Sequence, residues 1–350
     1  MGKITKKIKT KLKVQGAHKT EKEKLEERRE EVLSQGRKFK YPMQFAKHRL
    51  VFITIGIAMI ALVLAGVLGW VTLYKTQRTS DILYRIITVI PVPVATVDGE
   101  PVRYSDYMMI YRSSIMPVEQ QNGTFSSTES DVENFRDYYK RTALTEAENY
   151  TYAIKLAKQL GITITEEQID QAFDEHRKLG STERSQEGFL KVLEDNFNLS
   201  EREYRRMLYL SLIKTEVSKK IDTNALNLAN EAYAKVKNGE DFKEVAESLG
   251  LEYSSTNELI DIKNVDGGRS DRAYSMNPGE ISDIFVSDNG DCYYILKLNE
   301  KADGKVSYVS ITIPFTEFDS RMKNVREENR VEEFIELADT TTEASGEQTE

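Results

Sequence analysis

A long apolar run near the N-terminus constrains this chain more than any other feature of its sequence. No charged residue occurs between Leu50 and Tyr74, and a helix of this length crosses a hydrocarbon core of about 30 Å. A buried core helix is the first alternative, but such helices are seldom this long and this uniformly apolar. Trp70 lies near one end of the run, where aromatic rings favour the membrane interface. The run therefore predicts a transmembrane helix at residues 50–74.

A cleavable signal peptide is the second alternative for this segment. The run exceeds the usual core of about 7–15 residues and follows 49 other residues, which favours an uncleaved signal anchor. Basic residues precede it, including Lys38, Lys40, Lys47 and Arg49. By the positive-inside rule they place the N-terminus in the cytoplasm. We therefore expect a single-pass protein of the cell membrane with its main domain extracytoplasmic.

Charge is distributed unevenly along the 350 residues. The first 75 contain 17 Lys and Arg against 6 Asp and Glu, and the remainder contains 32 against 51. So acidic a body lacks the basic face that phosphate binding needs, which argues against nucleic acid as a partner. The basic tail at residues 1–49 fits a role in topology and lipid contact, with RNA binding as the alternative. The mixed charges of residues 21–31 are typical of a solvated helix.

Cysteine and histidine usage excludes several kinds of site. The single cysteine, Cys292, cannot form an intramolecular disulfide. Of the three histidines, His18 and His48 precede the apolar run and only His176 follows it. This count argues against a Ser-His-Asp triad and a His-rich metal site, and we expect neither a metal nor a cofactor.

Beyond a linker at residues 75–91, the pattern is mainly helical up to about residue 236. Three capping-box signatures precede helical runs, at Ser130, Thr165 and Ser200, each with Glu or Gln three residues later.

The segments at residues 92–221 resemble, in order, the chaperone domain of SurA/PrsA-type foldases. VATVDGEPVRYSDYMM is similar to the strand and turn that open this domain, EAENYTYAIKLAKQLGITITEEQIDQAF to its next helix, and FLKVLEDNFNLSEREYRRMLYLSLIKTEV to the helix pair that follows. The resemblance implies a helical SurA N-like domain that binds unfolded or nascent exported polypeptides. It makes the secretion machinery a further candidate partner.

Residues 222–314 resemble a parvulin-type peptidyl-prolyl isomerase domain. AYAKVKNGEDFKEVAESLG is similar to its helical pair, and MNPGEISDIFVSDNGDCYYILKLNE to its C-terminal strands. Asn289-Gly290 between alternating apolar runs predicts a β-hairpin. Together the two resemblances imply an α+β fold in which a helical domain precedes a reduced antiparallel sheet.

The departures from the parvulin pattern bear on activity. The first strand with its histidine is missing, the second family histidine falls at Tyr294, and the pocket segment shrinks to RSDRAYSM, too short for the usual helix. We carry over no catalytic residue, although Tyr294 and Tyr308 fall near the family histidine positions. Isomerisation must overcome a barrier of about 18–20 kcal/mol and needs a pocket for the proline ring. The sequence predicts that this pocket is degenerate, and leaves enzyme activity open.

The alternating segment VSYVSITIP, residues 306–314, offers a replacement for the missing strand. Paired with YYILKL, it would fill the vacant position as in a circular permutation. The alternative is pairing with VATV at the start of the preceding domain. After it we predict a C-terminal helix at residues 315–338 and a disordered tail at residues 339–350.

An apolar helix at residues 104–116 supplies the candidate peptide-binding side chains: Tyr107, Met108, Tyr111 and Met116. Flexible Met and amphipathic Tyr suit promiscuous binding of unfolded chains. The alternative is that these residues form the core.

The sequence thus predicts a membrane-anchored extracytoplasmic chaperone, or foldase, with a degenerate parvulin-like domain. An active isomerase that uses other side chains is one alternative, and a structural adaptor at the membrane is another.

Overall fold

The computed structural model describes residues 20–40, 42–77, 81–122, 129–179 and 182–337, and the chain divides into two units, residues 1–70 and 71–350. The described residues of the first unit form two helices, α1 (Glu21–Lys40) and α2 (Pro42–Trp70). Within the described residues, the helix over Arg49–Lys75 is the one long and apolar enough to cross a membrane. Its apolar side chains are exposed, as Leu62 and Leu68 illustrate, so it does not fit the alternative of a buried core helix.

The second unit begins without the predicted linker at residues 75–91. A π-helical turn (Val71–Lys75) leads to α3 (Asp81–Val89). Leu73 is buried in the core, and the Tyr104 hydroxyl donates a hydrogen bond of 2.8 Å to its carbonyl oxygen. Tyr84 and Ile87 of α3 are buried in the same core. The linker prediction is wrong because these apolar side chains find partners in the folded domain.

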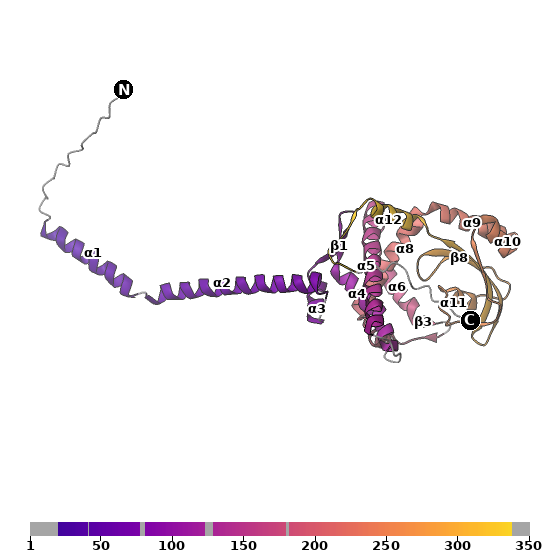
Figure 1. The fold of residues 1–350 in the computed structure, drawn as a ribbon, viewed down its shortest axis with the longest axis horizontal. Coiled ribbons are helices and arrows are strands. Elements are labelled where there is room, and N and C mark those ends of the chain that lie inside the picture. Colours follow the sequence, from indigo (N-terminus) through magenta and orange to yellow (C-terminus); the bar gives the residue numbers. More distant parts are fainter. Residues whose placement is uncertain (1–19, 41, 78–80, 123–128, 180–181, 338–350) are drawn as a thin grey trace, which may run out of the picture. The chain divides into compact units, whose positions relative to one another are not determined.

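Helices make up most of the domain that follows (Figure 1). Its helices are α4 (Tyr104–Asn122), α5 (Glu129–Leu160), α6 (Glu166–Arg177), α7 (Gln186–Phe197) and α8 (Glu201–Ile221). Thr165 and Ser200 form complete capping boxes, as predicted. The third signature is wrong, because Ser130 lies inside α5.

The strands of this domain are short. They are β1 (Pro93–Val97), β2 (Glu100–Arg103), β3 (Lys178–Leu179) and β4 (Thr182–Glu183). The turn between β1 and β2 places Asp98 and Gly99 at positive φ, as Asp-Gly hairpin turns require. At the other edge of β1 lies β10 (Val331–Glu333), in the order β10-β1-β2.

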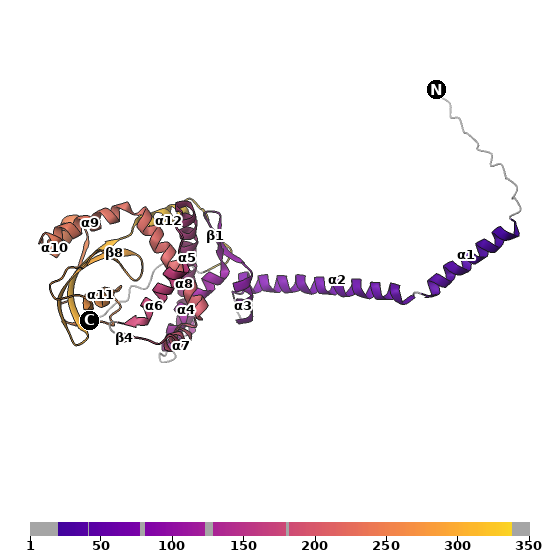
Figure 2. The same ribbon diagram turned by 180° about the vertical axis from the view of Figure 1, so that it is seen from behind.

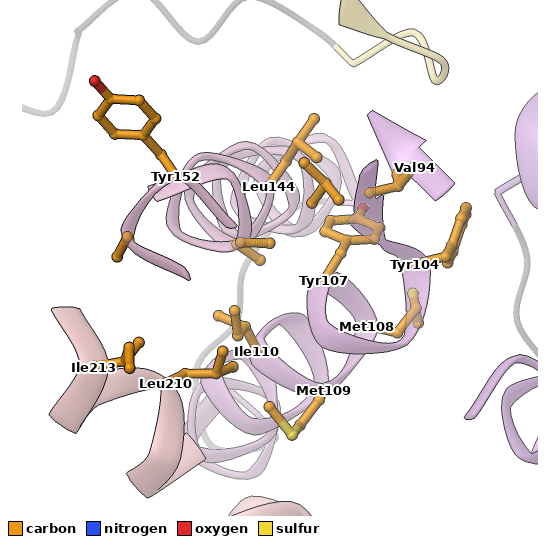
Figure 3. Close-up of a cluster of buried hydrophobic side chains, with 14 of the residues drawn as sticks. Val94, Tyr104, Tyr107, Met108, Met109, Ile110, Leu144, Tyr152, Leu210 and Ile213 are labelled. Atoms are coloured by element: carbon orange, nitrogen blue, oxygen red, sulfur yellow. The ribbon is translucent and has the colours of Figure 1, made fainter. Parts of the chain in front are cut away.

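The core of this domain contains Tyr107 and Met108, two of the four residues that we considered for peptide binding. Figure 3 shows Tyr107 and Met108 of α4 among the buried side chains. Their exposed fractions are 2% and 5%, whereas Tyr111 and Met116 are half-buried. The prediction of a binding surface is therefore wrong for Tyr107 and Met108, because neighbouring helices and β1 bury this face of α4.

The C-terminal segment returns to this core. In α12 (Glu317–Glu327), Phe318, Met322 and Val325 are buried with the residues of the helical domain. The helix ends well before the predicted residue 338, because Asn329 adopts a left-handed φ of 54° and the chain continues as β10. The predicted tail at residues 339–350 lies outside the described residues.

Between α8 and α12 the chain forms an antiparallel sheet. The helices are α9 (Thr223–Lys237), α10 (Phe242–Leu249) and α11 (Arg269–Tyr274), and the strands are β5 (Glu252–Ser255), β6 (Ile260–Asp261), β7 (Phe285–Val286), β8 (Cys292–Ala302) and β9 (Lys305–Pro314). The strand order is β5-β9-β8-β7, and β6 pairs with β9. In both views, α9 and α10 lie on one side of the sheet and α11 on the other (Figure 1 and Figure 2). The segment RSDRAYSM thus forms a helix after all, although a short one.

The position of β9 confirms the first of the two pairings considered. It pairs with β8 along its whole length, with Tyr294 opposite Thr312 and Leu298 opposite Tyr308. The strand that would open a parvulin domain is thereby replaced by the strand that follows its end. Pairing with β1, the alternative, is wrong, because β10 and β2 occupy both edges of β1.

Asp222 holds together the beginnings of two helices. Its Oδ1 accepts the backbone N–H of Ala225 in α9 at 2.9 Å. Its Oδ2 accepts the N–H groups of Thr316 and Glu317 at 2.7 and 3.0 Å. Burial alone would raise the pKa of Asp222, but these donors hold it below its usual value. One buried carboxylate thus fixes where α9 and α12 begin.

Candidate functional site

A cleft of about 990 Å³ opens in the helical domain. Its walls come from α3, β2, α4, α6, α7 and α8. Apolar side chains that line it include Met109, Ile169, Leu190 and Tyr209. A cleft of this size is in the range of ligand-binding sites.

Ion pairs fix part of the cleft wall. Arg206 in α8 binds Asp106 in α4 through two hydrogen bonds, of 3.3 Å and 2.7 Å. The hydroxyl of Tyr84 donates to Glu203 at 2.5 Å, and the guanidinium carbon of Arg112 lies 4.3 Å from the centroid of the Tyr84 ring. Burial is the main reason that the pKa of Tyr84 is raised. These contacts join α3, α4 and α8 into one rigid wall.

Other arginines in the cleft keep hydrogen-bonding capacity free. Among the described residues, Arg85 and Arg202 have no carboxylate within salt-bridge distance, and both are exposed. The Nε of Arg103 is buried without a hydrogen-bond partner in the described part of the chain. Guanidinium groups offer several N–H donors and no acceptor. The cleft can therefore bind carbonyl or carboxylate oxygens beside its apolar surface.

The sheet of the second domain carries the other candidate site, on the face toward α11. This face bears Tyr294, Leu296 and Leu298 from β8 and Tyr308, Ser310 and Thr312 from β9, because alternate residues share one side of a strand. The two tyrosines lie on the same face but are not opposite each other. Tyr294 faces Thr312, and Tyr308 faces Leu298. The two side chains named in the sequence therefore do not form a pair.

The loop before α11 occupies this face at Tyr308. The Tyr308 hydroxyl and the Ser270 hydroxyl each donate to Oδ2 of Asp266 at 2.5 Å. The backbone N–H of Ser270 donates to the other carboxylate oxygen at 3.1 Å. Burial, followed by the contact with Asp266, raises the pKa of Tyr308. This hydroxyl is thus a structural donor rather than a proton-transfer group at neutral pH.

The same loop covers Tyr294. A Cβ placed on Gly267 would come within 2.8 Å of the Tyr294 hydroxyl oxygen. The guanidinium carbon of Arg269 lies 4.8 Å from the ring centroid, and Nη1 of Arg269 donates to Ser310 Oγ at 3.3 Å. Residues 266–270 therefore cover Tyr294 and Tyr308 on this face of the sheet.

The chemistry available at this face is limited. Burial raises the pKa of the neighbouring Cys292 thiol to about 11, so it is not ionised at neutral pH and is a poor nucleophile. Within the described ranges, no group of three or more His, Cys, Asp or Glu is placed to hold a metal ion. His176 is exposed and contacts Tyr204, with 2.5 Å between Nδ1 and the hydroxyl oxygen.

Sequence reasoning missed the cleft. Its free arginines come from α3, β2 and α8, so no local motif brings them together. The residues proposed for peptide binding do not line it, and a binding role for Tyr111 and Met116 stays a prediction.

Comparison with known protein families gives two matches. The model of the SurA-like N-terminal domain matches residues 43–218. The model of the PPIC-type PPIase domain, the rotamase family, matches residues 211–300. A search of curated proteins finds no match. The rotamase match stops before β9, the strand that completes the sheet.

Proposed function

The chain belongs to the family with the SurA-like N-terminal domain, and from this premise we propose that it is a membrane-anchored extracytoplasmic chaperone whose rotamase domain has lost isomerase activity. Its clients would be unfolded exported polypeptides. The observation that carries this proposal is the contrast between an open cleft in one domain and an occupied sheet face in the other.

The cleft supports client binding because it combines two kinds of contact. Leu190 and Tyr209 offer apolar surface, and Arg202 offers donors for the carbonyl groups of an extended chain. An unfolded polypeptide always carries such carbonyls and irregularly spaced apolar side chains. Contacts of this kind are tolerant of sequence, as a chaperone requires.

Two features support membrane anchoring. The apolar helix over Arg49–Lys75 can span a bilayer, and basic residues precede it, which favours a cytoplasmic N-terminus. Leu73 at its end is part of the folded core, so a cut after Leu73 would remove a core residue. The test is a protein tagged at both ends. Recovery of both tags on one chain in the membrane fraction supports an anchor, and loss of the N-terminal tag would support a signal peptide.

Loss of isomerase activity is supported by the residues at the sheet face. Tyr294 stands at the position that the family gives to histidine, and Gly267 and Arg269 cover it. The alternative, an active isomerase, is supported by the completed sheet, β5-β9-β8-β7. A proline-peptide isomerisation assay with the full chain in detergent decides between them. We expect the uncatalysed rate, and acceleration in proportion to protein concentration would contradict the proposal.

Suppression of client aggregation tests the chaperone proposal. The full chain should keep a chemically denatured client soluble, and Arg202→Glu should raise the concentration needed by about tenfold, as expected for a loss of about 1.4 kcal/mol. Lys243→Glu, the same charge change at an exposed site on α10, is the matched control and should leave suppression unchanged.

A second pair of variants tests the apolar surface. Leu190→Asp lies in the cleft and Leu226→Asp on exposed surface of α9. We expect weakened suppression with the first variant alone, and thermal unfolding must show that both variants are folded. No suppression by the wild-type chain would instead favour a structural adaptor.

A further inference from the structure

Helix α3 has two apolar sides, and only one of them is covered by protein. On one side Tyr84 and Ile87 are buried in the core of the helical domain. The other side exposes Ile82, Ile86 and Val89, and Ile90, the residue directly after the helix, is exposed beside them. The exposed fractions are 74%, 47%, 76% and 55%. Their spacing of four, three and one residues places them along one stripe of the helix. Such a stripe marks an interaction surface.

The position of α3 in the chain restricts what can cover this stripe. The helix begins at Asp81, six positions after Lys75, where the apolar helix ends. At about 3.3–3.6 Å per residue, this stretch spans at most about 20 Å. Leu73, in the last turn of the apolar helix, is moreover buried in the same core as Ile87. A bilayer crossed by the apolar helix must therefore lie close to α3.

We propose that α3 lies in the membrane interface, with Ile82, Ile86, Val89 and Ile90 inserted among the lipids of the outer leaflet. This inference rests on the proposed membrane anchoring. Arg85 is exposed on the same helix, and its long side chain can reach lipid phosphates while the apolar stripe is buried.

The arrangement has a consequence for the cleft. Tyr84, Arg85 and Thr88 of α3 line it, so an interfacial α3 sets the cleft at the membrane surface. Polypeptides that emerge from the membrane would meet the cleft before they reach the rotamase domain.

Tryptophan quenching by brominated lipids tests the inference. Trp70 is the single tryptophan of the chain, so Trp70→Phe gives a background in which one introduced tryptophan reports its surroundings. The full chain is reconstituted in vesicles of phosphatidylcholine and phosphatidylglycerol. Ile86→Trp and Val89→Trp are the probes. Phe197→Trp, an exposed aromatic position in the same domain (38% exposed), is the matched control.

We expect shallow-brominated lipids to quench tryptophan at positions 86 and 89 at least twofold more than at position 197, with blue-shifted emission. Equal quenching at all three positions would overturn the proposal. Blue-shifted emission without quenching would also overturn it, because protein, either a second copy or a client, would then cover the stripe. Shallow-brominated lipids should also quench Trp70 of the wild-type chain, which lies near the end of the apolar helix. If Trp70 is quenched but tryptophans at positions 86 and 89 are not, the interfacial position of α3 is refuted and the membrane anchor is not. If Trp70 is not quenched either, both the anchor and this proposal are refuted.

Discussion

The two domains differ in whether their candidate site is open or covered by the protein's own residues. The helical domain keeps a cleft of about 990 Å³ with uncompensated guanidinium groups, whereas the rotamase-like sheet has its face filled by residues 266–270 of its own chain. A retained fold does not by itself imply a retained site. In our proposal, the free volume and free donors, and not the family resemblance alone, distinguish the domain that binds a client.

The largest effect is expected from removing the side chain that anchors the filled face. Tyr308 is 2% exposed and donates to Asp266. Tyr308→Ala should lower the free energy of unfolding by about 4 kcal/mol, typical of an aromatic-to-alanine change in a core. Tyr308→Phe keeps the ring and should cost about 1–2 kcal/mol. Denaturant titration measures both. No loss of stability in Tyr308→Phe would mean that the hydroxyl contributes nothing to the closure.

Asp222 links the two domains that are being compared, so its loss should destabilise both. Asp222→Ala leaves the first N–H groups of α9 and α12 without an acceptor, and should cost about 3 kcal/mol, more than a single N-cap. The pKa of Asp222 is lowered in the fold. Its contribution is therefore present above the unfolded value of 3.8 and lost as pH falls through the folded value. Asp222→Asn should flatten this acid transition. An unchanged transition would contradict the role.

Glu148 should make the stability of the helical domain depend on pH. It is 2% exposed in α5, accepts a hydrogen bond of 2.9 Å from Arg326 of α12, and burial raises its pKa to about 7. Because the folded pKa exceeds the unfolded value of 4.5, stability is highest below pH 4.5 and falls as pH rises through 7, by about 2–3 kcal/mol. Glu148→Gln should remove this slope in a series of thermal melts. If the melting temperatures of the wild type and Glu148→Gln changed with pH in the same way, Glu148 would not be the group responsible.

Two glycines allow the cost of packing at the filled sheet face to be separated from the cost of the backbone conformation. Gly267 and Gly279 both have positive φ, of 74° and 84°, but a Cβ at Gly267 meets Tyr294 while one at Gly279 meets nothing within 4 Å. Both alanine variants should lose about 1–2 kcal/mol from the backbone conformation. Gly267→Ala should lose about 1 kcal/mol more, from the overpacked contact with Tyr294. Equal unfolding midpoints would show that the loop moves away from the tyrosine without cost.

Local signals in the sequence predicted local structure well. The capping boxes at Thr165 and Ser200 are present because one side chain and one N–H decide each of them. The alternation of VSYVSITIP predicted β9. The missing first strand of the parvulin pattern predicted that β9 pairs with β8. The signature at Ser130 failed because α5 already includes Glu129, and a capping box cannot form inside a helix.

Features that depend on distant partners were not predictable from the sequence. The apolar pattern of α4 is the same whether Tyr107 faces a client or a core, and only the packing of α5 and β1 settles it. Similarly, β10 was predicted as helix because its pairing with β1 crosses more than two hundred residues. The cleft combines side chains from six elements, each unremarkable on its own.

The burial of α12 and β10 in the helical domain also determines the order in which the protein can fold. Phe318, Met322, Val325 and Ile335 complete a core whose other buried residues come before Asp222, and the whole rotamase domain separates the two parts in sequence. During synthesis the helical domain therefore stays incomplete until α12 and β10, near the end of the chain, have been made. Long-range closure of this kind slows folding.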